Sequence, residues 1–496
     1  MKLSEVRFSG FAVGYGKADI TPDPTTKISL TGNNDDRTRL STGRRESLWA
    51  NCIAFTDTDG TTVILFGTDL HGTEDDVWQE IQQGIEERTG VPAYFMQAGA
   101  SHNHQAPNQC TFSLTPVRMN NKVMVQKCIQ AAVDAMEDRA VAKMYMGIGR
   151  PEDMVFTRHF VLKNGDYLGW GGPANSRFDE IQGYMEKGDN LLQVVKFVRE
   201  GKKDVAVINW QGHPHGRIGT DRKDSYTLLY GGGPTVMRDK LLEKADCESV
   251  YIMGGSGNST QAPFLRPHNK FADYEHYGET LADEVIKVFE NMTPAQTGKI
   301  HYYADMRVFP VPGDVRKRPY AAFGFGDFGY AAQPFESFQS NAIAVREASP
   351  YFMTIYNQVA NGNRVSGYLP DAKSWTYDCY EHRPCFSPPG SGEVVQQWLT
   401  DMIWDLFRKS GQSVKEKLPG YYRDRTPKWD GNTYDILPDQ EITPSKYGHC
   451  PIQAILNGQE VNILAETEEL ARKILERKQV KLLINEQNMT VGLIDN

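Results

Sequence analysis

The sequence has few cysteines, no long hydrophobic run and no excess of positive charge. Its seven cysteines are spread along 496 residues without a Cys-x-x-Cys pair, which argues against a disulfide framework and a cysteine-based zinc site. No segment approaches the ~18 apolar residues of a membrane-spanning helix, and the first residues lack the apolar stretch of a signal peptide. We therefore expect a cytoplasmic protein with reduced thiols and no membrane span.

The charge balance argues against a nucleic-acid partner. The chain has 54 Lys and Arg against 63 Asp and Glu, and its net charge of -9 repels phosphate backbones. Hydrophobic residues make up 40% of the chain and the mean hydropathy is -0.52, as in a soluble globular protein with a core. We expect a small-molecule substrate as the partner; the sequence does not indicate the oligomeric state.

Several common catalytic motifs are also missing. The sequence contains no Gly-x-Ser-x-Gly nucleophile elbow, no His-Glu-x-x-His helix and no P-loop spacing. The glycine-rich segment 254–258 matches neither nucleotide-binding pattern. Two interpretations of it stay open: glycines with positive φ in a tight turn, or backbone N–H groups that form an oxyanion cradle.

The order of apolar and polar segments predicts an α/β fold. A β-branched run at 61–69, a helical pattern at about 74–88 and a second strand at 93–98 have the spacing of a strand-helix-strand crossover. The same order of strand, helix and strand recurs at 204–210, about 235–244 and 249–253. A further strand is expected at 351–359, and helices at about 273–290 and 391–408. The predicted fold class is α/β, with mixed, largely parallel sheets flanked by helices and a metal site at the carboxyl ends of strands.

The chain is expected to divide near residue 412. Residues 1–412 would form the catalytic domain, and 413–496 a linker followed by a small C-terminal α/β unit. Turn pairs such as Asp430-Gly431 indicate a connecting stretch up to about residue 444.

Two His-x-His pairs follow predicted strands. His102 and His104 come after the strand at 93–98, and His213 and His215 after the strand at 204–210. Imidazoles are common zinc ligands, and a catalytic zinc takes about three protein N or O ligands and keeps a position open. One such pair is more often incidental, but two at equivalent positions favour a metal site.

Several motifs occur in a fixed order along residues 11–410. Segment 14–22 matches a Gly-x-Gly-x-x-Asp-Ile-Thr pattern and is followed by a strand at 49–55. Ala100-Ser101-His102-Asn103-His104-Gln105-Ala106-Pro107 is similar to a Thr-His-Thr-His-Ser-Gly-Pro signature. In these motifs the chain resembles the neutral/alkaline ceramidases, zinc amidases that cleave the amide of ceramide. The resemblance implies a ceramidase-like relative; without a signal peptide, we expect a cytosolic one rather than a true ceramidase.

The resemblance implies a Zn²⁺ site with four ligands. His102 and His213 match the family's zinc histidines, the latter in Asn-Trp-Gln-Gly-His at 209–213. Glu336, in Gln-Pro-Phe-Glu-Ser-Phe at 333–338, would be the carboxylate ligand. Tyr368, in Asn-Arg-Val-Ser-Gly-Tyr at 363–368, would be the phenolic ligand.

Further residues match catalytic positions of the family. His104 corresponds to a histidine that contacts substrate, and Arg158 and Tyr380 to an arginine and a tyrosine at the scissile group. Thr260, with Ser259 beside it, stands where the family has a serine regarded as a nucleophile. Because metal-bound water needs no serine, this difference favours attack by water.

The leading hypothesis is a zinc-dependent hydrolase that cleaves a carbon-nitrogen bond of an N-acyl or other small amide. Asp69 and His71 are expected to orient the metal ligands. The alternatives are a metal-dependent lyase, isomerase or glycan-acting enzyme on the same scaffold, or a non-catalytic metal- or ligand-binding protein.

Overall fold

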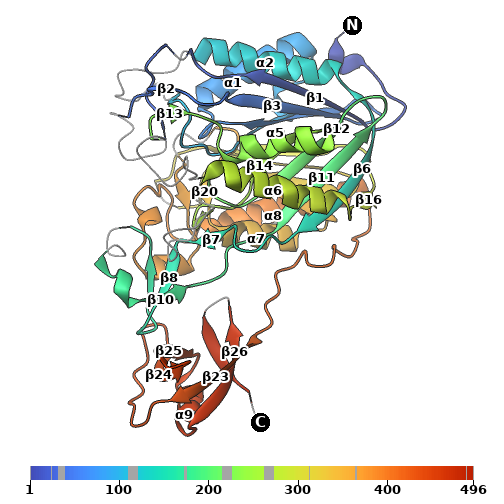
Figure 1. Cartoon of the computed structure of the whole chain (residues 1–496). Helices are drawn as coiled ribbons and strands as arrows, with labels where there is room; N and C mark the ends of the chain where they lie inside the picture. Colours follow the sequence, from blue (N-terminus) through green and yellow to red (C-terminus); the bar gives the residue numbers. More distant parts are fainter. Residues whose placement is uncertain are drawn as a thin grey trace. The chain divides into compact units, whose positions relative to one another are not determined.

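The chain forms two compact units (Figure 1). The computed structural model describes residues 2–23, 25–31, 39–109, 121–171, 176–214, 226–261, 273–311, 313–362, 366–486 and 489–494. The first unit consists of Met1–Val155, Asp189–Asp371 and Cys385–Tyr421, and the second of Phe156–Gly188, Ala372–Pro384 and Tyr422–Asn496. The second unit thus takes two segments from the middle of the chain, and a division near residue 412 stays a prediction.

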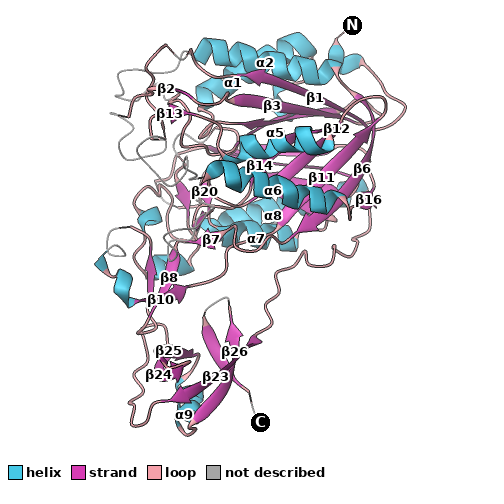
Figure 2. Ribbon diagram, in the orientation of Figure 1, coloured by secondary structure: helices cyan, strands magenta, loops and turns pink. Residues whose placement is uncertain are grey.

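The first unit contains a nine-stranded mixed sheet (Figure 2). Its strand order is β14-β12-β11-β6-β1-β3-β4-β5, and β16 also pairs with β6. The strands are β1 (Ala12–Asp19), β3 (Trp49–Thr56), β4 (Thr62–Thr68), β5 (Met96–Ala100), β6 (Ala140–Gly149), β11 (Leu192–Arg199), β12 (Asp204–Trp210), β14 (Cys247–Met253) and β16 (Thr293–Ala295). Among the pairs described in this sheet, β4·β5 and β12·β14 are parallel and the others antiparallel.

The expectation of a largely parallel sheet is therefore wrong, although the sheet is mixed. Layers on both of its faces bury β4 completely and β12 except for its first residue, so these sequences are continuous apolar runs whatever the direction of the strand. Both parallel pairs are the predicted crossovers: α1 (Asp75–Thr89) connects β4 to β5, and α5 (Gly233–Ala245) connects β12 to β14.

A second, four-stranded sheet packs against one face of the large sheet. It has the order β17-β18-β19-β21, with β17 (His301–Arg307), β18 (Arg318–Phe325), β19 (Phe328–Ala332) and β21 (Met353–Asn357). The core between the sheets is rich in phenylalanine, and the ring centroids of Phe55 and Phe325 are 5.2 Å apart. The strand expected at 351–359 is β21, so it belongs to this sheet and not to the large one.

Helices cover the outer faces of both sheets. Alternate residues of the large sheet face away from the phenylalanine core and pack against α1, α2 (Asn121–Glu137), α5 and α6 (Tyr274–Phe289). Helices α7 (Gln339–Ala348) and α8 (Ser391–Ser410) pack on the four-stranded sheet. The first unit is therefore built of four layers, helix, sheet, sheet and helix (Figure 1).

Glycines in the first strand explain part of the opening motif. A Cβ at Gly14 would lie 1.9 Å from the Ala135 carbonyl oxygen, and one at Gly16 would lie 2.2 Å from that of Ala131. Helix α2 therefore crosses β1 at a distance that only glycine permits. Between these glycines, Tyr15 donates to Asn51 Oδ1 at 2.9 Å.

Close packing also brings β14 to β4, far away in the strand order. A Cβ at Gly67 of β4 would lie 2.6 Å from the Tyr251 carbonyl oxygen of β14. At the end of β14, the Gln358 N–H donates to the Met253 carbonyl at 3.1 Å. The ends of β4, β5, β12, β14 and β21 consequently converge, although β21 belongs to the other sheet.

The second unit contains a three-stranded sheet and a closed five-stranded barrel. The sheet has the order β10-β8-β9, with β8 (His159–Leu162), β9 (Tyr167–Gly169) and β10 (Ile181–Tyr184). The barrel has the order β23-β24-β25-β27-β26, with β23 (Lys428–Ile436), β24 (Cys450–Leu456), β25 (Gln459–Ala465), β26 (Gln479–Asn485) and β27 (Thr490–Leu493). Helix α9 (Glu468–Leu475) lies between β25 and β26, and β25 is parallel to β27, which is the connectivity of the OB-fold.

Two expectations about the whole chain can be compared with the described residues. Six of the seven cysteines lie in described segments; each is a free thiol, and five of them are buried. No helix in the described part of the chain has the length and apolar character needed to cross a membrane.

Candidate metal centre

His102 lies just beyond β5, in a backbone conformation that is unusual for a histidine. Its φ is +58°, in the left-handed region, and its side chain is completely buried. Its Nδ1 lies 2.8 Å from the His71 carbonyl oxygen. A carbonyl can only accept, so Nδ1 carries the proton and Nε2 presents a lone pair.

His213 has the same arrangement at the end of β12. It is completely buried, and its Nδ1 donates to the Ser256 carbonyl oxygen at 3.1 Å. Its Nε2 therefore also presents a lone pair, and it lies 3.3 Å from Nε2 of His104. Metal-binding histidines characteristically donate the other ring N–H to a carbonyl or carboxylate in this way.

Glu336 and Tyr368 face each other across two short strands. Strand β20 (Glu336–Ser337) pairs in parallel with β22 (Tyr368–Leu369), with Glu336 directly opposite Tyr368. Glu336 Oε2 lies 3.1 Å from His102 Nε2, yet neither atom has a hydrogen-bond partner of normal geometry among the described residues. Burial raises the pKa of Glu336, whereas protonated His102 and His71 would lower it, as a hydrogen bond with Tyr368 also does.

The structure thus brings three predicted ligands to one place. One nitrogen each of His102 and His213 and one oxygen of Glu336 all lie within 4.8 Å of one another. Tyr368 joins this group through its hydrogen bond with Glu336. Two imidazoles, a carboxylate and a phenol form a set of N and O donors that suits zinc.

A glutamine connects the segments that carry His213 and Glu336. Gln358 Oε1 accepts from the Ser256 N–H at 3.1 Å and from the Ser337 N–H at 2.9 Å, and its Nε2 donates to Ser256 Oγ at 2.7 Å. The Gly257 N–H also donates to the Ser337 carbonyl at 2.7 Å. The carbonyl that orients His213 is therefore fixed to the strand that carries Glu336. Gln358 differs in no visible way from other glutamines in the sequence, so no motif indicated its role.

The glycine-rich segment 254–258 has a packing role. The chain does turn tightly at 257–258, where the Ser259 N–H donates to the Ser256 carbonyl at 3.0 Å. None of Gly254, Gly255 and Gly257 has a positive φ, so that part of the tight-turn interpretation is wrong. A Cβ at Gly257 would lie 2.5 Å from the Glu336 carbonyl oxygen. The N–H groups of Gly254, Ser256 and Gly257 donate within the protein, which leaves these three unable to form the oxyanion cradle.

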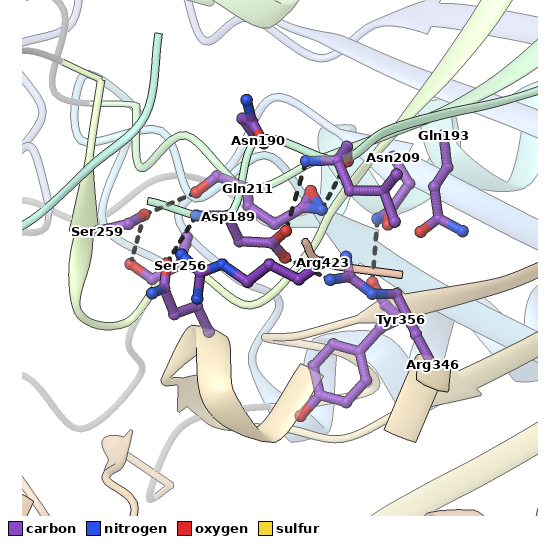
Figure 3. Close-up of polar contacts among 12 residues, drawn as sticks. Asp189, Asn190, Gln193, Asn209, Gln211, Ser256, Ser259, Arg346, Tyr356 and Arg423 are labelled. Atoms are coloured by element: carbon purple, nitrogen blue, oxygen red, sulfur yellow. Dashed lines mark hydrogen bonds and ion pairs between the residues drawn. The ribbon is translucent and has the colours of Figure 1, made fainter. Parts of the chain in front are cut away.

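Ser259 and Thr260 form the short strand β15 (Ser259–Thr260), and both are buried. Ser259 Oγ donates to the Gln211 carbonyl oxygen at 2.7 Å and lies 3.2 Å from that of Ser256 (Figure 3). The Ser259 hydroxyl is therefore held by carbonyl acceptors rather than by a general base.

Asp69 and His71 support the centre through their backbone and through buried contacts. Asp69 is completely buried and accepts from Thr235 Oγ1 at 2.9 Å and from Arg238 Nη2 at 2.6 Å. Asn103 Nδ2 donates to the Asp69 carbonyl at 3.3 Å, so this anchor extends to the segment with His102. The expected orienting role of His71 is visible in its carbonyl, which accepts from His102 Nδ1.

Comparisons with known proteins identify the architecture. No family model matches the chain, and a search of curated proteins found no match. Among solved structures, the neutral ceramidase from Pseudomonas aeruginosa has a TM-score of 0.65 at 13% identity, over 90% of this chain and 84% of that one. A ceramidase complexed with C2 has a TM-score of 0.63 at 12% identity, over 98% of each chain. This chain has the fold of the neutral ceramidases. The family resemblance found in the sequence motifs is thereby confirmed for a distant, ceramidase-like relative.

Arg158 and Tyr380, which the resemblance predicted as catalytic residues, belong to the second unit. Trp170 connects their backbones, because its N–H donates to the Arg158 carbonyl and its carbonyl accepts from the Tyr380 N–H, both at 2.8 Å. Arg158 Nη2 lies 2.8 Å from Oε1 of the completely buried Glu381. Burial would raise the pKa of Glu381, but Arg158 and His159 lower it to about 2. His215 lies outside the described residues.

Proposed function

We propose that this chain is a metal-dependent hydrolase that cleaves an amide bond, with zinc held by His102, His213, Glu336 and Tyr368. One observation carries the proposal. The buried His102 and His213 each donate from Nδ1 to a carbonyl, which leaves an Nε2 lone pair on each ring. These nitrogens lie close to the Glu336 carboxylate. The ceramidase-like fold supplies the reaction class as an expectation.

The residues present fit a metal ion better than they fit one another. His102 Nε2 and Glu336 Oε2 face each other at 3.1 Å without hydrogen-bond geometry, a costly arrangement for two buried polar atoms. Donor atoms bound to one tetrahedral zinc stand about this far apart. A zinc ion would act there as a Lewis acid and lower the pKa of a bound water towards ~7.

The surrounding residues have roles that follow from their chemistry. His104, with its Nε2 at 3.3 Å from His213 Nε2, is placed to hold and transfer a proton. We assign to Arg158 and Tyr380 the stabilisation of negative charge on the carbonyl oxygen, with Arg158 oriented by Glu381. Thr260 stands at the catalytic position where the family has a serine, and we assign it no covalent role. The engaged Ser259 hydroxyl supports attack by water over a covalent route.

The substrate we propose is an N-acyl or other small amide. The cytoplasmic location expected from the sequence remains a prediction.

The test combines metal analysis with turnover. Purified protein should contain about one tightly bound zinc per chain and release free amine from at least one member of a panel of acyl amides. His102→Ala and His213→Ala should lose both metal and turnover, whereas His301→Ala, which removes a histidine of β17, should keep both. If either ligand variant keeps full metal and activity, the assignment of the site is wrong.

A further inference from the structure

Several apolar side chains of the first unit are exposed to solvent near the connection from β17 to β18. A phenylalanine from a later segment lies beside them. The side chain of Val315 is 83% exposed and that of Phe386 53%, and the other members are Met306, Val308 and Val311. Single exposed apolar residues are normal, but a group of them close together marks an interaction site. We call these five residues the apolar patch.

Contacts within the first unit bring these segments together. The Arg316 guanidinium lies over the Phe386 ring, 5.5 Å from its centroid. Asp314 Oδ2 accepts from the Phe309 N–H at 2.8 Å and from Arg318 Nη1 at 2.9 Å. Phe309 itself is buried. The connection between the two strands is therefore a folded loop with a buried anchor, and it holds the exposed side chains in defined positions.

The apolar patch has a local positive charge. The two carboxylates next to it are balanced, Asp314 by the arginine described above and Asp305 by Arg307 at 3.1 Å. Arg316 and Lys317 are exposed, and neither has a carboxylate partner among the residues that the structure describes. At physiological salt a charge acts over about 8 Å. These two cations, and not the net charge of -9, therefore decide which charges this surface attracts.

The apolar patch adjoins the segment that carries a proposed metal ligand. Cys385, directly before Phe386, forms an antiparallel bridge with Gly367. The next residue, Tyr368, pairs with Glu336. A partner bound to Phe386 is therefore held close to the candidate metal centre.

We propose that the apolar patch, together with Arg316 and Lys317, docks on the surface of an anionic lipid bilayer. Apolar side chains insert at the boundary of head groups and acyl chains, while adjacent cations attract the anionic head groups. A stable protein interface covers about 800 Å² on each partner, more than five partly exposed side chains provide. Docking of this kind needs no membrane-spanning helix, and it would hold the metal centre beside amides dissolved in the lipid.

The experiment measures the binding of full-length protein to lipid vesicles by sedimentation. Vesicles of phosphatidylcholine with about 30% phosphatidylserine should bind the protein. Vesicles of phosphatidylcholine alone should bind it at least about tenfold more weakly, because each cation near an anionic surface contributes about fivefold. Raising the NaCl concentration from about 0.1 M to about 0.5 M should weaken binding to the anionic vesicles, since salt screens the attraction.

Two double variants locate the docking surface. Val315→Ser with Phe386→Ser should weaken binding to the anionic vesicles at least about fivefold, because it removes the side chains that insert. Arg316→Gln with Lys317→Gln should weaken it about 25-fold. Val414→Ser is the matched control and should bind like the wild type, since Val414 is also exposed, at 58%, but belongs to the segment after α8. Thermal unfolding at the wild-type temperature checks that each variant is folded.

Three results would overturn the proposal. They are no binding to the anionic vesicles, equal binding to both kinds of vesicle, and unchanged binding by Val315→Ser with Phe386→Ser. Analytical ultracentrifugation tests the other occupant, a second copy of this chain. A dimer that this double variant dissociates would assign the apolar patch to self-association and also overturn the proposal. Vesicle binding without any amide cleavage would refute the proposed function and leave this inference standing.

Discussion

The buried ion pair of the second unit gives a prediction whose size can be worked out. Glu381 is completely buried; its Oε1 lies 2.8 Å from Arg158 Nη2 and its Oε2 3.3 Å from His159 Nε2. His159 Nδ1 in turn lies 2.7 Å from the Tyr377 hydroxyl. Glu381→Gln keeps the size of the side chain and removes its charge, which leaves the Arg158 guanidinium buried without its counterion.

The pKa of Glu381 sets the expected loss. Burial raises this pKa, but Arg158 and His159 outweigh burial and lower it from 4.5 to about 2. At ~1.4 kcal/mol for each tenfold change in proton affinity, the ionised carboxylate stabilises the folded state by about 3 kcal/mol. Removing one partner of a buried pair typically costs ~3–5 kcal/mol, so two independent arguments agree. Because the folded pKa lies below the unfolded one, this stability is present above about pH 4.5 and is lost as the pH falls towards about 2.

The assay is urea unfolding of wild type and Glu381→Gln, followed by tryptophan fluorescence. At pH 7 the variant should lose about 3 kcal/mol of unfolding free energy, and the difference should shrink as the pH falls from 4.5. Glu180→Gln is the matched control, since it breaks an exposed Arg177–Glu180 pair in the same unit and should leave unfolding unchanged. A double variant, Arg158→Met with Glu381→Leu, should be more stable than Glu381→Gln alone, because it buries no unpaired charge. The reasoning fails if Glu381→Gln unfolds like the wild type at pH 7.

Two further predictions concern the first unit. Gly16→Ala places a Cβ 2.2 Å from the Ala131 carbonyl oxygen and should cost ~1–3 kcal/mol of unfolding free energy, measured by urea unfolding. The control is Gly43→Ala, whose Cβ would come no closer than 3.4 Å to a neighbouring side chain and which should change the stability little. Equal stability of Gly16→Ala and wild type would contradict the close crossing of α2 over β1. Ser259→Ala removes a hydroxyl that is bound to two carbonyls, so the variant should retain kcat within about tenfold of wild type. The measurement is a steady-state assay of amine release. Complete loss of turnover would instead favour a covalent mechanism.

The sequence predicted the elements that bear the site better than the way they pair. Helices α1, α6 and α8 lie close to their predicted ranges, because each has an apolar face that repeats with the helical period. Helix α5 also lies close to its predicted range, although its apolar face is weak. Both parallel crossovers were expected from the spacing of strand, helix and strand. The antiparallel pairs were not, since strands that are buried on both faces have the same apolar character in either direction.

Strand β23 shows how a local signal can mislead. Its Asp430-Gly431 pair predicted a turn in a connecting stretch. In the barrel the pairing of β23 with β26 shifts register between Trp429 and Thr433, and Gly431 has a φ of +83°. Asp430 and Gly431 therefore form an irregularity within one strand, not a connection between two strands. From the sequence alone, a glycine in such an irregularity cannot be distinguished from a glycine in a turn.

The candidate centre shows a similar division between what sequence and fold contribute. The motifs predicted which imidazoles would lie close together. Each imidazole has two nitrogens, and the nitrogen that can bind a metal is the one whose neighbour in the ring donates a hydrogen bond elsewhere. Here those partners are the carbonyls of His71 and Ser256, whose side chains have no part in the contact. Backbone atoms leave no signature in a sequence, and they reach these positions only when β4, β5, β12 and β14 converge. Substitutions that move the loop of Ser256, such as Gln358→Leu, should therefore weaken metal binding without touching a ligand.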